Sequence, residues 1–199
     1  QLRALLRASV YGDLRIMFPM IATLGEFRKA KGILMEEKEK LVAEGIAVSD
    51  NFQVGIMIEI PAAAVLADQF AKEVDFFSIG TNDLTQYTLA LDRAHPTLNF
   101  LSDSLNPSVL RMVKIIVDGA KSTNIPVGVC GAVASEPAGA ILLIGLGVRA
   151  LSVVPSAIAD IKALIRKLNL KKCEEVSQQA LNCPSVAEVR ALVKKEFEI

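Results

Sequence analysis

The residues of this chain that are best suited to chemistry lie at or after the ends of short apolar runs of the kind that form buried strands. They are two carboxylates, an amide, an arginine and a thiol: Glu59, Asp83, Asn82, Arg93 and Cys130. In both common architectures built from parallel strands, ligands bind beyond the carboxyl ends of the strands. We therefore expect these side chains to meet at one rim of a sheet.

Glu59 is the clearest candidate because the run Ile56–Ile58 before it is apolar and should carry its carboxylate to a partly buried position. A buried lone carboxylate is costly, so it needs a cation or a hydrogen-bond donor. Together with Asp83 it makes an oxygen-rich site of the kind that Mg²⁺ accepts, with water and substrate oxygens at the remaining positions. A salt bridge to lysine or arginine is the alternative, and the residues alone favour neither.

Asn82 and Asp83 stand between the predicted strand Val74–Ile79 and a helix whose apolar residues begin at Leu84. Gly80 allows a sharp turn at this point, and polar side chains here commonly cap the first turn of a helix. Capping alone accounts for an isolated Thr-Asn-Asp. The polar ends of the other strands favour a role in binding.

Cys130 lies in the run Gly128–Gly131, at the end of another predicted strand. A buried thiol usually packs as a small hydrophobe, but at a strand end facing a metal it can act as an acid or a nucleophile. Arg93 is positioned to fold back over the site, where a guanidinium suits a planar carboxylate or a phosphate. The alternative for Arg93 is a surface arginine in a loop. His95 is expected to be exposed and not catalytic.

Five apolar runs alternate with helical patterns and predict the strands of a parallel sheet: Leu14–Ile21, Val54–Ile60, Val74–Ile79, Ile125–Gly131 and Arg149–Val154. Such alternation requires crossover connections and indicates the α/β class. The sequence has no glycine-rich dinucleotide fingerprint after its first strands, which disfavours a Rossmann fold. Five strands are too few to close an eight-stranded barrel, which typically needs about 250 residues. The pattern leaves a doubly wound sheet and part of a barrel open.

Helical spacing and cap residues predict the intervening helices. Leu24–Gly45 is expected to form a long charged helix with an apolar stripe made by Phe27, Ile33, Leu34, Leu41 and Val42. Pro61 suits the first turn of a helix that continues over Ala62–Ala71. Asn106 and Pro107 are the expected N-cap and first-turn proline of a helix reaching about Thr123. Later helices are expected at Glu136–Gly145, Pro155–Leu168, Lys172–Leu181 and Val186–Phe197.

The composition supports one sizeable folded domain and excludes several classes of partner. Of the 199 residues, 52% are hydrophobic, and 22 basic residues balance 22 acidic ones. No global field therefore draws the chain to nucleic acid or to an anionic membrane. The three cysteines have neither paired nor zinc-ribbon spacing. Because no apolar run approaches the roughly 20 residues of a membrane helix and no signal-peptide core is present, we expect a soluble, cytoplasmic protein.

The segment Phe76–Arg93, FFSIGTNDLTQYTLALDR, closely resembles the signature of enzymes that use phosphoenolpyruvate. It is most similar to the enzyme I family of the sugar phosphotransferase system, the phosphoenolpyruvate–protein phosphotransferases. The resemblance also takes in LRIMFPMI at Leu14–Ile21, GIMIEIPAAA at Gly55–Ala64, VCG at Val129–Gly131 and LLIGLG at Leu142–Gly147. It therefore extends over nearly the whole chain.

The resemblance implies a TIM (β/α)8 barrel of the phosphoenolpyruvate-utilising type. Residues 1–199 match the carboxyl-terminal part of that barrel, roughly its last five strands. The amino-terminal strands, which carry the family's other substrate-binding arginines, are expected to be missing from this sequence, as is the domain with the phosphorylated histidine. The family also implies a homodimer.

For the site, the resemblance implies transfer of a phosphoryl group from phosphoenolpyruvate, with Mg²⁺, to that histidine and onward to a phosphocarrier protein, with release of pyruvate. Glu59 and Asp83 match the family's metal ligands. Asn82, Asp83 and Arg93 match its substrate-binding residues, and Cys130 matches the proton donor to the enolate carbon.

Two departures from the family pattern are visible. Ala132 stands where the family usually has glutamate, and Leu101–Pro107 lacks the usual aromatic-Gln-Pro sequence. The nearest alternatives are a barrel of the pyruvate phosphate dikinase or phosphoenolpyruvate synthase type and the enzyme I portion of a fused multiphosphoryl transfer protein. A non-catalytic dimerisation module is a further alternative, although packing alone would not require all five polar residues together.

Overall fold

The computed structural model describes residues 1–198, in which five parallel strands form one sheet in the order β1-β2-β3-β4-β5. The strands are β1 (Arg15–Phe18), β2 (Gln53–Ile58), β3 (Phe77–Gly80), β4 (Val127–Cys130) and β5 (Ala150–Ser152). Each strand pairs with the next one along the chain, so the strand order does not reverse within the described residues. A doubly wound sheet requires such a reversal, and this order is instead that of a barrel. The predicted α/β class and the positions of the strands are confirmed.

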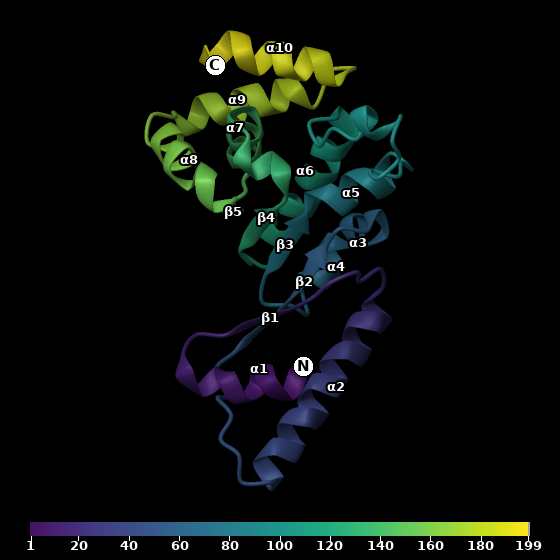
Figure 1. The fold of residues 1–199 in the computed structure, drawn as a ribbon, viewed down its shortest axis with the longest axis vertical. Coiled ribbons are helices and arrows are strands. Elements are labelled where there is room, and N and C mark those ends of the chain that lie inside the picture. The colour runs from purple at the N-terminus through teal and green to yellow at the C-terminus, as the bar shows by residue number, and fades with distance from the viewer. Residues whose placement is uncertain (199) are drawn as a thin grey trace.

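Helices connect the strands and extend beyond both ends of the sheet. They are α1 (Leu2–Ala8), α2 (Leu24–Ala43), α3 (Pro61–Val65), α4 (Ala67–Phe70), α5 (Thr81–Thr88), α6 (Pro107–Lys121), α7 (Pro137–Leu146), α8 (Ile158–Ile165), α9 (Leu170–Ala180) and α10 (Val186–Phe197). Short 3-10 turns are η1 (Ser9–Tyr11), η2 (Asn99–Leu101), η3 (Ala132–Ser135) and η4 (Pro155–Ala157). In Figure 1, α1 and α2 lie at one end of the molecule and α8 to α10 at the other.

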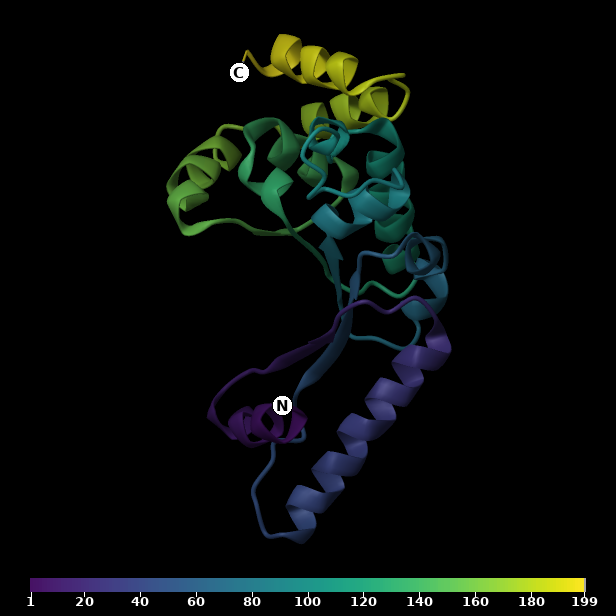
Figure 2. The same cartoon turned by 45° about the vertical axis from the view of Figure 1, so that its right-hand side comes forward.

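The two faces of the sheet differ in chemistry. Along β4, Val127 and Val129 are buried, whereas Gly128 and Cys130 are only partly buried on the opposite face. Successive side chains of a strand point to opposite faces, so the small and polar residues share one side. Figure 2 shows α2, α3, α4 and α6 on the other side, where the core lies. The face without crossover helices is therefore available to a site.

Two details of the predicted helices are wrong. In α2, Phe27, Leu34 and Leu41 are fully buried, but Ile33 and Val42 are 44% and 57% exposed, because a narrow stripe with seven-residue spacing suffices for contact. The helix predicted over Ala62–Ala71 is broken at Leu66 into α3 and α4.

The break at Leu66 brings the start of α4 against Gly119 of α6. A Cβ at Gly119 would lie only 2.7 Å from the backbone nitrogen of Asp68. Glycine therefore permits a close approach between the backbones of α4 and α6. No proline or glycine stands at the break itself.

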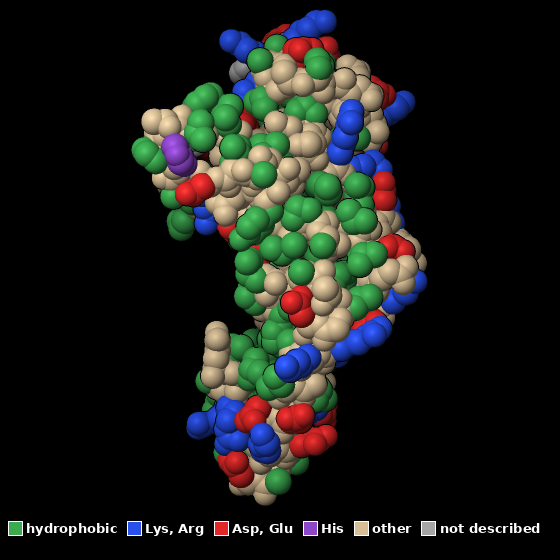
Figure 3. Space-filling view, turned by 90° about the vertical axis from the view of Figure 1, so that its right-hand side faces the viewer, with side chains coloured by type: hydrophobic (Ala, Val, Ile, Leu, Met, Phe, Trp, Pro, Cys, Tyr) green, Lys and Arg blue, Asp and Glu red, His purple; other side chains and the backbone are tan. Residues whose placement is uncertain are grey.

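Charged and apolar surfaces are separated along the molecule. In Figure 3 charged side chains gather at the end formed by α1 and α2, where Arg3 pairs with Glu44 and Lys38 with Asp50. Hydrophobic side chains extend over the middle of the same face.

Among residues 1–198, no helix combines the length and the apolar character needed to cross a membrane.

Candidate active site

The strand register places two of the predicted site residues, Glu59 and Cys130, in one row at the carboxyl end of the sheet. Gly80 pairs with Cys130, and Cys130 pairs with Ser152 on the next strand. Glu59 directly follows the last paired residue of β2 and so stands level with Gly80. Neighbouring strands are about 4.8 Å apart, so roughly 10 Å separates the backbones of Glu59 and Cys130, with Gly80 between them.

Glu59 is buried, with 3% of its surface exposed, and its Oε1 accepts a hydrogen bond of 2.7 Å from the backbone N–H of Met20. Met20 has a φ of 56°, an uncommon conformation for a residue with a side chain. Burial raises the pKa of Glu59; the Met20 N–H opposes this shift, the charge of Asp83 adds to it, and Arg93 opposes it. Among residues 1–198, the structure thus pairs this carboxylate with a backbone donor and not with a lysine or arginine salt bridge, and it places Asp83 and Arg93 within electrostatic reach.

Gly80 provides the space that Glu59 occupies. A Cβ at this position would lie 2.8 Å from Glu59 Oε2 and 2.9 Å from Met57 Sδ. Those distances are shorter than side-chain contacts allow, so a larger residue at position 80 would push the carboxylate aside. The glycine predicted as a turn residue therefore also shapes the site.

The first turn of α5 carries Asn82 and Asp83, and neither side chain caps the helix. The N-cap is Gly80, which offers no side-chain cap, and Asn82 Oδ1 instead accepts a 3.3 Å bond from the Ala132 N–H. Asp83 Oδ1 lies 3.5 Å from Nη2 of Arg93, so the arginine does fold back toward the rim. Capping, the alternative for these two residues, is therefore not what their side chains do at the start of α5.

Gly131 lets the strand β4 end close to α5. Its φ is 131°, and a Cβ there would lie 2.1 Å from Thr81 Oγ1. Thr81 in turn donates a 3.0 Å hydrogen bond to the Cys130 carbonyl. Only glycine suits both the conformation and the space, and the close approach brings the Cys130 and Asn82 segments together.

Cys130 is partly buried on the small and polar face of the sheet. Its Sγ accepts a weak 3.7 Å bond from the Ser78 hydroxyl and lies 3.6 Å from the Ile79 carbonyl, to which the thiol can donate. Cys173 is buried in α9 and Cys183 lies after that helix, away from the rim. The position of Cys130 differs from that of an ordinary core thiol because its side chain shares the row that holds Glu59.

A polar cavity of about 620 Å³ lies beside this row and is lined by Asn82 and Arg93. Asp103, Glu136 and Arg190 also line it, and no motif in the sequence pointed to these three. Glu59, Asp83 and Cys130 do not line the cavity, so the predicted residues are divided among the row, the first turn of α5 and the neighbouring hollow.

The site can offer a cation two carboxylates. Within residues 1–198 the structure contains no group of three or more His, Cys, Asp or Glu side chains placed to hold a metal ion. Mg²⁺ commonly uses only one or two protein carboxylates and completes its octahedral shell with water and substrate phosphate oxygens. The buried Glu59 near Asp83 fits this mode of binding better than an all-protein cage.

Comparison with known proteins gives a consistent result. The sequence model of the family described as PEP-utilising enzyme, PEP-binding domain, matches residues 1–170. Proteins named phosphoenolpyruvate-protein phosphotransferase are 53% identical over 195 residues in Listeria monocytogenes and 52% identical over 196 residues in Enterococcus faecalis. Each alignment covers 98% of this chain, and the chain spans about a third, 34%, of the length of these relatives.

A solved structure also shares the fold. The citrate lyase of Burkholderia xenovorans superposes with a TM-score of 0.61 and 17% identity, over 99% of this chain and 67% of that one. At this identity the likeness concerns the fold alone, which is of the TIM-barrel type. The family model matches most of the sequence, residues 1–170, and the chain belongs to the family of PEP-binding domains of PEP-utilising enzymes.

Proposed function

We propose that this chain is the phosphoenolpyruvate-binding part of a phosphoenolpyruvate–protein phosphotransferase of the sugar phosphotransferase system. The observation that carries the proposal is the grouping of Glu59, Asp83 and Arg93 at the rim. In this reaction the bond between phosphorus and the enol oxygen of phosphoenolpyruvate breaks, and a bond to a histidine nitrogen on a separate domain forms. The phosphoryl group then passes to a phosphocarrier protein, and the leaving enolate takes up one proton at its methylene carbon to become pyruvate.

Each site residue has a role in this proposal. Glu59 and Asp83 hold Mg²⁺, which when bound neutralises charge on the phosphoryl oxygens. Arg93, next to Asp83, binds the phosphate or carboxylate of the substrate by parallel hydrogen bonds. Asn82 orients the substrate from the first turn of α5. Cys130 donates the proton to the methylene carbon.

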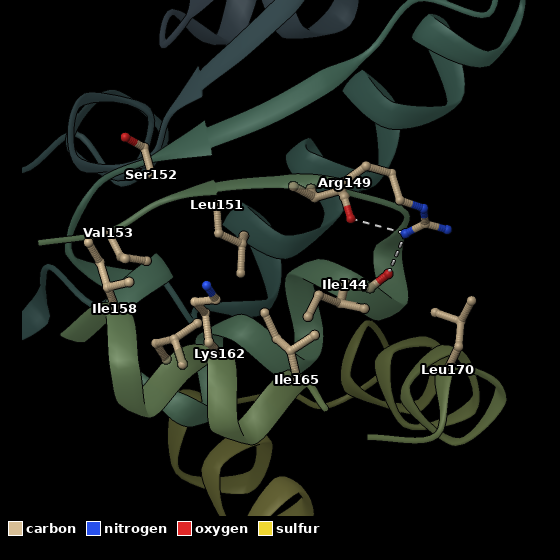
Figure 4. A pocket seen from close by; sticks show the side chains of 11 residues that line it. Ile144, Arg149, Leu151, Ser152, Val153, Ile158, Lys162, Ile165 and Leu170 are labelled. Carbon is tan, nitrogen blue, oxygen red and sulfur yellow. Dashed lines mark hydrogen bonds between the residues drawn. The ribbon is translucent and has the colours of Figure 1, made fainter. Parts of the chain in front are cut away.

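The domain is completed in our proposal by strands from elsewhere in a longer polypeptide. Within the described residues, β1 pairs with β2 alone and β5 with β4 alone, so both edges of the sheet can accept a further strand. Beside β5 lies an apolar groove of about 670 Å³, between that strand and α8 (Figure 4). Leu151, Ile158 and Ile165 point into it. The relatives' greater length supports the idea that further strands close a (β/α)8 barrel here.

This proposal predicts that residues 1–199 alone bind phosphoenolpyruvate at least about tenfold more weakly than the full-length protein. Contacts from the remaining strands would be lost, and one hydrogen bond to a charged group contributes about 1.5–3 kcal/mol, or tenfold and more in affinity. Isothermal titration calorimetry in the presence of Mg²⁺ measures both affinities, after circular dichroism has shown that the isolated chain is folded. Equal dissociation constants would refute the domain proposal.

Replacing Gly80 by alanine is expected to weaken activation by Mg²⁺ about tenfold, as changes around metal ligands commonly do. The new Cβ displaces the Glu59 carboxylate, as the distances above require. The concentration of Mg²⁺ that gives half-maximal activity is the measurement. Gly128→Ala, on the neighbouring strand, is the matched control because its Cβ would meet Ala150 Cβ at an ordinary 3.4 Å. If Gly80→Ala and Gly128→Ala require the same Mg²⁺ concentration for half-maximal activity, Gly80 does not support Mg²⁺ binding by Glu59.

The function itself is tested with the full-length protein and ³²P-labelled phosphoenolpyruvate. We expect Mg²⁺-dependent pyruvate release with label on a histidine, and then on a phosphocarrier protein when one is added. Formation of labelled ATP that requires AMP and pyrophosphate would indicate a dikinase, formation that requires AMP and inorganic phosphate a synthase, and no pyruvate release a non-catalytic module. The proposal also carries two expectations: a cytoplasmic location and self-association as a dimer, which fractionation and analytical ultracentrifugation test.

A further inference from the structure

Arg190, on the last helix α10, reaches the polar cavity beside the site. Its Nε and Nη2 donate to Asp103 Oδ2 at 3.0 and 2.8 Å, and its Nη1 donates to Glu136 Oε2 at 3.2 Å. Asp103 lies in the connection between α5 and α6, and Glu136 is the N-cap of α7. One guanidinium therefore links three separate parts of the chain. Arg190 also lies beyond residues 1–170, the part that the family model matches.

The cavity holds a balanced set of charges. Its lining includes two carboxylates, Asp103 and Glu136, and two guanidinium groups, Arg93 and Arg190. Arg190 engages both carboxylates, whereas Arg93 lies 3.5 Å from Asp83 at the rim. Without Arg190, two uncompensated negative charges would face the cavity. They would attract Arg93 and repel an anionic substrate.

The contact to Asp103 also fixes one end of the connection that carries Arg93. Asp103 Oδ1 accepts a 2.8 Å bond from the Leu105 N–H, and the hydroxyl oxygens of Ser104 and Thr85 lie 2.9 Å apart. The first bond shapes the segment before α6, and the second joins that segment to α5, whose first turn holds the predicted substrate residues. The guanidinium thus holds Asp103 in a segment that is already tied to the site.

We propose that Arg190 is a positioning residue: by neutralising Asp103 and Glu136 it keeps Arg93 at the rim and lets the site accept an anionic substrate. The inference rests on the proposed function, since phosphoenolpyruvate is the anion concerned. Arg190 itself is not a catalytic residue, because it acts through Arg93 and the charge of the cavity.

The test uses steady-state kinetics of the full-length protein with phosphoenolpyruvate. Arg190→Met is expected to raise the KM for phosphoenolpyruvate about tenfold and to change kcat less than about twofold, because ground-state binding of the anion is what weakens. Adding Asp103→Asn and Glu136→Gln to Arg190→Met is expected to restore the KM to within about threefold of wild type. The asparagine keeps the acceptor for the Leu105 N–H, so the compensating changes remove charge and leave this backbone bond in place.

Arg111→Met is the matched control for a purely structural role. Arg111 also ties the carboxyl-terminal helices to the rest of the chain, through a 2.8 Å bond to the Leu181 carbonyl, and this bond engages no carboxylate. The inference is overturned if Arg111→Met raises the KM as much as Arg190→Met, or if the triple variant is no better than Arg190→Met. A wild-type protein that releases no pyruvate would instead refute the proposed function.

Discussion

Replacing Glu59 by glutamine is expected to abolish Mg²⁺-dependent phosphoryl transfer and, at the same time, to stabilise the metal-free protein. Activity falls about 1,000-fold because the variant lacks one of the two carboxylates proposed to hold the cation, whose contribution is several kcal/mol. Stability rises because glutamine keeps an acceptor for the Met20 N–H while removing a charge that is 3% exposed. Loss of function and gain of stability in one variant is characteristic of a buried charge retained for its chemistry.

The gain in stability should depend on pH in a direction set by the raised pKa of Glu59. Burial, the largest cause, lifts this pKa above its ordinary value of 4.5. Above pH 4.5 the unfolded chain has therefore released a proton that the folded protein still holds, so the wild type loses stability as the pH rises through the folded-state pKa. The Glu59→Gln variant has no carboxyl group at this position, so its stability does not fall in this way as the pH rises. Its advantage in Tm is expected to be small below pH 4.5 and to widen above it, by roughly 2–4 °C for each kcal/mol.

Thermal unfolding in EDTA and in saturating Mg²⁺, over a range of pH, measures both effects. Mg²⁺ should raise the Tm of the wild type by binding the folded state and should leave the Tm of the Glu59→Gln variant unchanged. Glu39→Gln, the same chemical change at an exposed position of α2, is the matched control. It should alter neither the Tm in EDTA nor the increase in Tm that Mg²⁺ causes. A Glu59→Gln variant that retains Mg²⁺-dependent activity would remove Glu59 from the metal site.

The fold was predictable where local chemistry decides the structure. Asn106 does cap α6, accepting a bond from the Ser108 N–H, and Pro107 occupies the first turn. The strand before Pro19 ends at Phe18, as a residue without an N–H requires. The break at Leu66 was not predictable, because no proline or glycine marks it in the sequence.

The same distinction applies to the site. Glu59 and Asp83 could be found from the sequence because each follows an apolar strand, and parallel strands deliver their carboxyl ends to one rim. The partner of Glu59 is a backbone N–H at Met20, a group that nearly every residue possesses and that no residue type reveals. Arg190 contacts Asp103 across 87 positions, from a helix that no strand precedes directly. Contacts of this kind appear only once the chain is folded.

Replacing Cys130 by alanine is expected to slow pyruvate formation by about 10²–10⁴-fold, the usual contribution of a general acid, with little change in the KM for phosphoenolpyruvate. The thiol lies in the row that also holds Glu59, and a thiol donates a proton far more readily than a serine hydroxyl does. Cys130→Ser, which keeps the size of the side chain, should therefore remain slow. Cys183→Ala is the control for loss of a thiol away from the rim and should be fully active.

The stereochemistry of protonation separates a proton donor from a packing residue. In D₂O the wild type is expected to convert (Z)-phosphoenolbutyrate into 2-ketobutyrate carrying deuterium in one configuration at C3, because the thiol delivers its deuteron to one face of the enol. The alanine variant should release the enol to solvent, where both faces are deuterated equally. A Cys130→Ala product that keeps a single configuration would show that another group donates the proton. The bonds of Sγ to Ser78 and Ile79 would then describe a thiol held for packing alone.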